Sequence, residues 1–144
     1  MQVKHILRNK GRDVVTTDDE TTLSEAARLL ARRRIGAVVV LDAKGSVRGI
    51  LSERDIVRAI AEQSVSALGQ SVGRHMTRAV STCSESDTVD ELMETMTHGR
   101  FRHMPVVEDD GRLSGIVSIG DVVKTCIEET TREAQSLREY IAAG

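Results

Sequence analysis

The chain repeats itself, and this constrains its fold more than any other feature. Residues 14–58 align with residues 80–124 without a gap, at a constant offset of 66 positions, and twelve of the 45 aligned pairs are identical. Many of the remaining pairs keep their chemical character, as Leu30 and Met96 do. An internal repeat on this scale indicates that one supersecondary unit occurs twice.

Each repeat has the pattern of a strand, a helix, two strands and a second helix. A short strand is predicted at residues 14–16, and Thr22 then begins a helix in the pattern of a capping box. The apolar run at residues 37–41 is typical of a buried strand, and a Gly-containing turn leads to a return strand at residues 47–51. A second helix begins near Ser52. The sequence therefore predicts an α/β fold of tandem β-α-β-β-α repeats.

One such unit cannot cover both faces of its small sheet, so we expect the two repeats to pack sheet against sheet around a pseudo-twofold axis. We assign residues 1–66 to the first repeat, residues 72–125 to the second, and residues 126–144 to a C-terminal helical extension. Two short helices are predicted as leading segments, at residues 4–10 for the first repeat and at residues 72–76 for the second.

Composition argues against several classes of partner. The chain has 20 basic and 22 acidic residues and a net charge of −2, which gives no broad attraction to nucleic acid or to an anionic membrane. The two cysteines, Cys83 and Cys126, lack metal-ligand spacing, and no apolar run approaches the roughly 20 residues that cross a bilayer. We expect a cytoplasmic protein without a metal, nucleic-acid or membrane partner.

Two related strings carry the strongest chemical signal. Residues 49–55 read Gly-Ile-Leu-Ser-Glu-Arg-Asp and residues 115–121 read Gly-Ile-Val-Ser-Ile-Gly-Asp. Each string alone is explained by helix capping, with Ser as the N-cap and an acid in the first turn. The same geometry also suits a ligand, because a helix N-terminus favours phosphate and an Asp nearby accepts hydrogen bonds from ribose hydroxyls. The recurrence of the string at one place in each repeat favours a binding site.

The repeat length, the order of elements and the two Gly-Ile-x-Ser-x-x-Asp strings resemble a CBS domain pair, also called a Bateman module, over about residues 8 to 125. The resemblance implies a regulatory sensor whose ligand lies in clefts between the repeats. The ligand would be an adenosine nucleotide, with AMP preferred and ATP, NAD(H) or S-adenosylmethionine as alternatives. The alternative function is a ligand-free interaction or scaffold protein. An enzyme ranks last, since no nucleophile or base has a positioned partner.

The resemblance carries over to particular residues. It implies that Asp55 and Asp121 bind ribose and that Ser52 and Ser118 lie at the phosphate end. For the Asp121 cleft the candidate nucleotide-binding residues are Val15, Gly36, Ala37, Ser118, Gly120 and Asp121. For the Asp55 cleft they are Ser52, Arg54, Asp55, Ser81, Arg102 and His103, and Lys10 and Arg78 are further phosphate candidates.

The two copies differ where a ligand would sit. Gly36 in the first repeat corresponds to Arg102 in the second, and Glu53 adds a negative charge that would repel a polyphosphate at the Asp55 cleft. We therefore expect two unequal clefts and favour the Asp121 cleft. No aromatic residue is expected to stack on the base.

The C-terminal stretch carries an independent pattern. Apolar and small residues alternate spacings of four and three at Val123, Ile127, Thr130, Ala134, Leu137 and Ile141. This is a heptad seam on a helix that runs beyond the second repeat. We favour a partner helix in a homodimer, and packing on the chain's own domain is the alternative. The sequence does not identify the effector protein that such a sensor would address.

Overall fold

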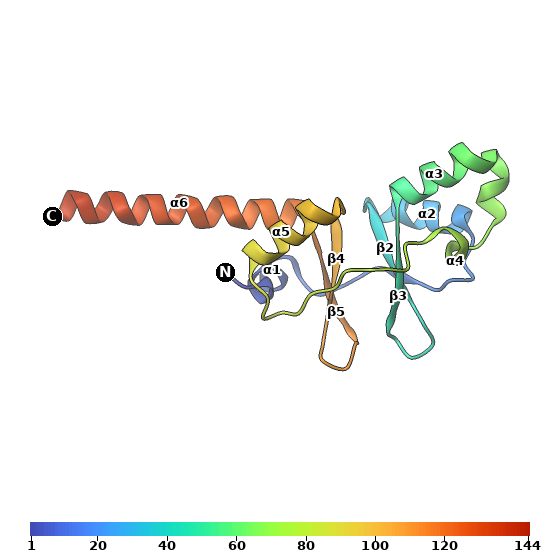
Figure 1. The fold of residues 1–144 in the computed structure, drawn as a ribbon, viewed down its shortest axis with the longest axis horizontal. Helices are drawn as coiled ribbons and strands as arrows, with labels where there is room; N and C mark the ends of the chain where they lie inside the picture. Colours follow the sequence, from blue (N-terminus) through green and yellow to red (C-terminus); the bar gives the residue numbers. More distant parts are fainter.

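The computed structural model describes all 144 residues and has the predicted order of elements in each half (Figure 1). The first half contains α1 (Val3–Lys10), β1 (Thr16–Thr17), α2 (Leu23–Arg33), β2 (Ala37–Leu41), β3 (Val47–Ser52) and α3 (Glu53–Gln63). A 3₁₀ helix η1 (Ser64–Gly69) and the short α4 (Val72–His75) lead to the second half. That half contains α5 (Val89–Gly99), β4 (His103–Val107), β5 (Leu113–Ser118) and α6 (Ile119–Ala143).

Equivalent residues begin and end the first helix of each repeat. The Thr22 hydroxyl accepts a hydrogen bond from the Glu25 backbone, and Thr88 caps α5 in the same way. The structure shows no hydrogen bond from the Glu25 or Glu91 side chain back to the cap backbone, so neither cap is a complete capping box. Arg34 and Arg100 end the two helices in the left-handed conformation, each with φ of 54°. These local signals confirm that the two repeats share one folding pattern.

The strands form two small sheets. In the first repeat β1 pairs in parallel with β2, and β2 pairs antiparallel with β3. In the second repeat β4 and β5 form an antiparallel pair. The first strand was predicted at residues 14–16 and lies at Thr16–Thr17, and its counterpart in the second repeat shortens to a single bridge between Cys83 and Val106. A strand this short makes too few ladder hydrogen bonds to extend far.

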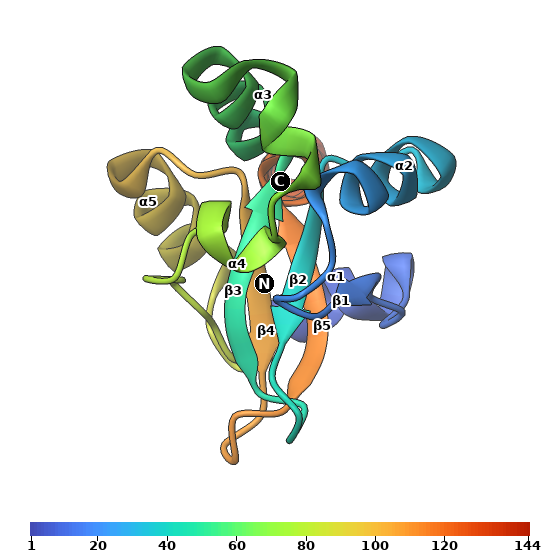
Figure 2. The same ribbon diagram turned by 90° about the vertical axis from the view of Figure 1, so that its right-hand side faces the viewer.

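The two sheets face one another, as expected from the uncovered face of each unit (Figures 1 and 2). Val38 and Val40 point into the core of the first repeat, so the alternate residues Ala37 and Val39 point to the opposite side. Both are nonetheless buried, with Val39 fully inaccessible, and neither belongs to a core within one repeat. The facing sheet of the second repeat therefore covers them.

The two leading helices cross over, which the sequence did not predict. Val3, Ile6 and Leu7 of α1 lie in the core of the second repeat, and the Val3 backbone donates to the Asp87 carbonyl. Conversely, Val72 of α4 lies in the core of the first repeat. We had assigned each helix to the repeat that follows it in sequence. That assignment describes the sequence; in space the buried apolar side chains of each helix complete the other repeat's core.

The last helix leaves the body of the protein. From Thr130 to Gly144 every residue is exposed, and Figure 1 shows α6 projecting away from both sheets. This confirms the predicted helical extension. No helix of the structure combines the length and the apolar character that a membrane span requires.

Replacing Gly49 with alanine is expected to destabilise the protein by about 1–3 kcal/mol. A Cβ there would lie 2.6 Å from the Met76 sulfur and 2.9 Å from the Thr77 carbonyl oxygen. The Thr77 backbone cannot retreat freely, since it pairs with Ile50. Urea denaturation measures the loss, with Gly69→Ala as the matched control because a Cβ at Gly69 meets nothing within 4 Å. Equal stability of the two variants would contradict this packing.

Candidate functional site

Both Ser-x-x-Asp strings form complete capping boxes. Ser52 donates its backbone N–H to Asp55 Oδ2 at 2.8 Å, and Ser118 does the same to Asp121 Oδ2 at 2.9 Å. Each Ser hydroxyl accepts a hydrogen bond from the Asp backbone in return. The capping explanation is therefore correct for both strings. A binding role depends on what surrounds each Asp and on which of its oxygen atoms stays accessible.

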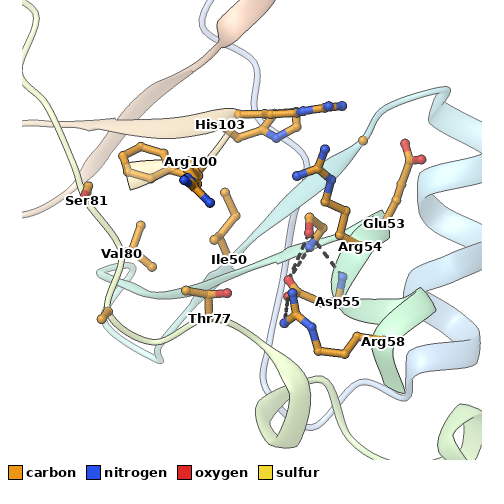
Figure 3. A pocket seen from close by; sticks show the side chains of 15 residues that line it. Ile50, Glu53, Arg54, Asp55, Arg58, Thr77, Val80, Ser81, Arg100 and His103 are labelled. Atoms are coloured by element: carbon orange, nitrogen blue, oxygen red, sulfur yellow. Dashed lines mark hydrogen bonds and ion pairs between the residues drawn. The ribbon is translucent and has the colours of Figure 1, made fainter. Parts of the chain in front are cut away.

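A cleft of about 340 Å³ opens beside Asp55, between the two repeats (Figure 3). This volume lies within the usual range of small-molecule sites, of about 300–1,000 Å³. The lining residues are Gly36, Ile50, Ser52, Glu53, Arg54, Asp55, Arg58, Thr77, Ala79, Val80, Ser81, Arg100, Phe101, Arg102 and His103. The six residues predicted for the Asp55 cleft are all among them.

Asp55 presents an acceptor that is only partly used. Its side chain is 6% exposed, and its Oδ2 atom accepts the Ser52 N–H and hydroxyl. Its Oδ1 atom receives only a long contact of 3.5 Å from Arg58, whose side chain is largely exposed. A buried carboxylate is costly without partners, so a ligand hydroxyl at Oδ1 would find a strong, oriented acceptor.

The mouth of the cleft is basic. Arg54, Arg58, Arg100 and Arg102 all line it, against the carboxylates of Glu53 and Asp55. In Figure 3 Asp55 and Arg58 approach from one side, whereas Arg100 and His103 approach from the other. Guanidinium groups match the geometry of phosphate oxygens. The repulsion expected from Glu53 is therefore set against four cationic groups, and the cleft favours an anionic ligand.

His103 lies between the two Ser-x-x-Asp sites. Burial lowers the pKa of its imidazole, and the positive charges of Lys10 and Arg102 act in the same direction. Glu53 from one site and Asp121 from the other oppose this effect, which places His103 within reach of both. The ring is therefore neutral at pH 7 and offers hydrogen bonds rather than a positive charge.

The Asp121 carboxylate is occupied by another side chain. Lys10 of α1 donates its ammonium to Asp121 Oδ2 at 2.7 Å and to the Ile116 carbonyl at 3.1 Å. Burial acts to raise the pKa of Asp121, but Lys10 and the hydrogen bonds of Ser118 outweigh it and leave the pKa below its usual value. We had preferred the Asp121 cleft. The structure instead shows a lined cleft beside Asp55 and a lysine ammonium on Asp121 Oδ2, although the Asp121 side chain is the more exposed of the two, at 25% against 6%, and its Oδ1 atom accepts no hydrogen bond.

The other residues assigned to the Asp121 cleft are dispersed. Gly36 lines the Asp55 cleft, where a Cβ would lie 3.1 Å from Glu53 Oε1. The Val15 carbonyl accepts the Val39 N–H, so this carbonyl takes part in the hydrogen bonding of the first sheet. Ala37 is buried between the sheets, and Gly120 lies at the start of α6. Of this group only Gly36 lines the Asp55 cleft, and the nucleotide-binding role of the others stays a prediction.

Several residues that line the Asp55 cleft were not predicted from the sequence. Arg58 follows Asp55 by three residues on α3, a spacing that places both on one helix face. Arg100 and Phe101 also line the cleft, although neither was named as a site residue. Arg78, which was predicted as a phosphate candidate, is not among the residues that line this cleft, and its guanidinium donates to the Gly73 carbonyl at 2.8 Å.

Replacing Lys10 with methionine is expected to raise the pKa of Asp121. The substitution removes the hydrogen bond and the positive charge that lower this pKa, while the opposing effect of burial remains. A depressed carboxyl pKa contributes stability that is present above the unfolded-state value and is lost as pH falls through the folded-state value. The stability advantage of the wild type should therefore disappear in acid. Carboxyl NMR titration measures the pKa, and Lys10→Arg is the control that should keep it low.

The remaining reactive groups offer little chemistry. Burial raises the pKa of Cys83 to about 12, and it also raises that of Cys126. Both side chains are therefore protonated thiols at neutral pH, which are poor nucleophiles. No group of three or more His, Cys, Asp or Glu side chains is arranged to hold a metal ion.

Comparisons with known proteins agree with the repeat architecture. A family model described as CBS domain matches residues 3–62 and 71–128. A mitochondrial CBS domain-containing protein of Arabidopsis thaliana is 34% identical over 152 residues, which cover 99% of this chain and 72% of that protein.

Two solved structures show how similar the folds are. A CBS-domain containing protein of Agrobacterium tumefaciens is 54% identical, with a TM-score of 0.83 over 87% of this chain and 98% of that chain. A CBS domain protein of Pyrobaculum aerophilum complexed with AMP is 28% identical, with a TM-score of 0.76 over 84% of this chain and 89% of that chain.

Proposed function

Because the chain belongs to the CBS domain family, we propose that it is a regulatory module that binds an adenosine nucleotide between its repeats, in the Asp55 cleft. The proposal rests on one observation. The cleft joins a buried, partly satisfied carboxylate of the first repeat to the Arg100 and Arg102 guanidinium groups of the second. An acceptor for hydroxyls beside a basic mouth is the combination that a ribose phosphate requires.

In this proposal the ribose hydroxyls donate to Asp55, and the phosphate meets the arginines. Ile50, Val80 and Phe101 supply apolar surface for the base. The volume of about 340 Å³ is small for a dinucleotide, and a basic mouth disfavours the sulfonium of S-adenosylmethionine. AMP is therefore the preferred ligand, and the AMP bound by the Pyrobaculum relative supports this choice.

Regulation would follow from the position of the ligand between the repeats. A nucleotide that contacts both repeats favours the arrangement in which Asp55 and Arg100 lie close together. Such coupling requires a difference in nucleotide affinity between two states of the module. An effector protein would read the change, and the module would act as a homodimer without catalysing a reaction of its own. The cytoplasm remains our predicted compartment, and cell fractionation tests it.

A thermal-shift panel tests the proposal. AMP, ATP, NADH and S-adenosylmethionine are compared at equal concentration, with inorganic phosphate as the control for simple anion binding. We expect AMP to stabilise most, by about 2.7 kcal/mol at a hundred times its Kd. No shift with any adenosine ligand at millimolar concentration would overturn the proposal and favour the ligand-free scaffold. A shift equal to that of phosphate would equally contradict nucleotide recognition.

A further inference from the structure

The last four turns of α6 have no partner within the chain. Met1 makes an ion pair with Glu129 at 2.6 Å, and beyond this contact every residue of the helix is exposed. An isolated helix of about 12–15 residues is only marginally stable in water. A packing partner would stabilise this segment, and the side chains it presents indicate which partner.

The apolar side chains of α6 follow one seam. Ile127, Leu137 and Ile141 are 61%, 59% and 67% exposed although they are large and apolar. In heptad notation Ile127, Ala134 and Ile141 occupy position a, and Val123, Thr130 and Leu137 occupy position d. In parallel coiled coils, isoleucine at a with leucine at d favours two strands over three or four. We propose that α6 pairs with α6 of a second copy as a parallel, in-register, two-stranded coiled coil.

The charges beside the seam fit this arrangement. Glu133 occupies position g, and Arg138 occupies position e of the next heptad. In a parallel, in-register pair, position g of one helix lies beside the following position e of its partner. Glu133 of each copy therefore meets Arg138 of the other copy, and the symmetry of the dimer forms this ion pair twice.

The opposite orientation places like charges together. An antiparallel pair that keeps the apolar layers aligned brings position g against g and e against e. Glu133 would then lie beside Glu133 of the second copy, and Lys124 would lie beside Arg138. Both contacts are repulsive, so the charge pattern selects the parallel orientation and specifies its register.

Sedimentation of two matched variants tests whether the seam holds the dimer. Leu137→Asp introduces a charge into the seam, whereas Ser136→Asp adds the same charge at the neighbouring outward position. Both residues are exposed in the single chain, so neither substitution disturbs the folded module. We expect the wild type and Ser136→Asp to be dimers at micromolar concentration and Leu137→Asp to be a monomer. A monomeric wild type, or a dimeric Leu137→Asp, would overturn the proposal.

Charge exchange tests the orientation. Glu133→Arg and Arg138→Glu should each weaken self-association about tenfold, since each replaces two attractive contacts by two repulsive ones. The double variant Glu133→Arg/Arg138→Glu should restore wild-type association. A mixture of the two single variants should form the heterodimer preferentially, because every cross-chain pair is then attractive. Loss of affinity without rescue in the double variant and the mixture would exclude the parallel register.

This proposal does not depend on nucleotide binding. AMP binding by Leu137→Asp is measured alongside, and we expect the monomer to keep its Asp55 cleft. The proposal of a helical dimer and the proposal of a nucleotide site can therefore be supported or overturned separately.

Discussion

Asp55→Ala is expected to weaken AMP binding at least about a hundredfold. Two hydrogen bonds from ribose to a carboxylate contribute about 1.5–3 kcal/mol each, and about 1.4 kcal/mol corresponds to a factor of ten. Isothermal titration calorimetry measures the loss. Asp121→Ala is the matched control, because Lys10 holds Oδ2 of that carboxylate at 2.7 Å and Asp121 does not line the Asp55 cleft, and we expect this variant to bind AMP almost as the wild type does.

The control for folding matters, because Asp55 also completes the capping box of α3. Asp55→Asn keeps an oxygen that can accept the Ser52 N–H while it removes the charge, so it separates capping from binding. We expect this variant to fold with nearly wild-type stability and still to lose most of its affinity. Equal losses from Asp55→Ala and Asp121→Ala would show that the two clefts are not distinguished as the structure indicates.

Leu7→Ala is expected to destabilise the protein by about 2–5 kcal/mol, the usual cost of deleting a buried leucine side chain. Leu7 is 1% exposed and lies in the core of the second repeat, although it belongs to the first repeat in sequence. Its side chain also packs over Gly115, where an added Cβ would lie 2.7 Å from Leu7 Cδ2. The substitution therefore tests the crossing of α1 directly.

Urea denaturation measures this effect, with Val65→Ala as the control. Val65 is 74% exposed, and its loss should change stability by no more than about 0.5 kcal/mol. If the repeats are interlocked by their leading helices, Leu7→Ala lowers the midpoint for the whole protein in one transition. A change as small as that of Val65→Ala would show that α1 does not belong to the core of the second repeat.

Much of the fold could be predicted because its signals are local. The Thr22 cap, the hairpin turns and the apolar run of β2 each depend on neighbouring residues, and the repeat supplies two copies of each. The crossing of α1 and α4 has no local signal. Both helices are amphipathic, and only the completed fold determines which repeat they cover.

The same distinction between local signals and long-range contacts applies to the candidate site. The Asp55 cleft was recognised as a set of residues, since the repeat and the family resemblance both point to them. The ion pair between Lys10 and Asp121, which leads us to propose the Asp55 cleft instead, was not predicted, because the two residues are 111 apart in sequence and meet through the position of α1. Phe101 was missed for a related reason: it follows the left-handed turn at Arg100, and its place in the cleft depends on the packing of the two repeats.

The capping boxes show how one motif serves two purposes. Ser52 and Asp55 fix the start of α3 whether or not a ligand is present. The same bonds hold the Asp55 carboxylate at the cleft wall, so a nucleotide would meet an acceptor that is already oriented. The second copy has the same geometry, but there the capping oxygen Oδ2 of Asp121 also accepts a hydrogen bond from Lys10.

A crystal structure of the protein grown with AMP tests the central claim most directly. We expect one nucleotide per chain in the cleft between the repeats, with its ribose hydroxyls on Asp55 and its phosphate among the arginines, while Lys10 remains on Asp121. A nucleotide held at Asp121 with Lys10 displaced, or an empty Asp55 cleft at saturating AMP, would contradict this account.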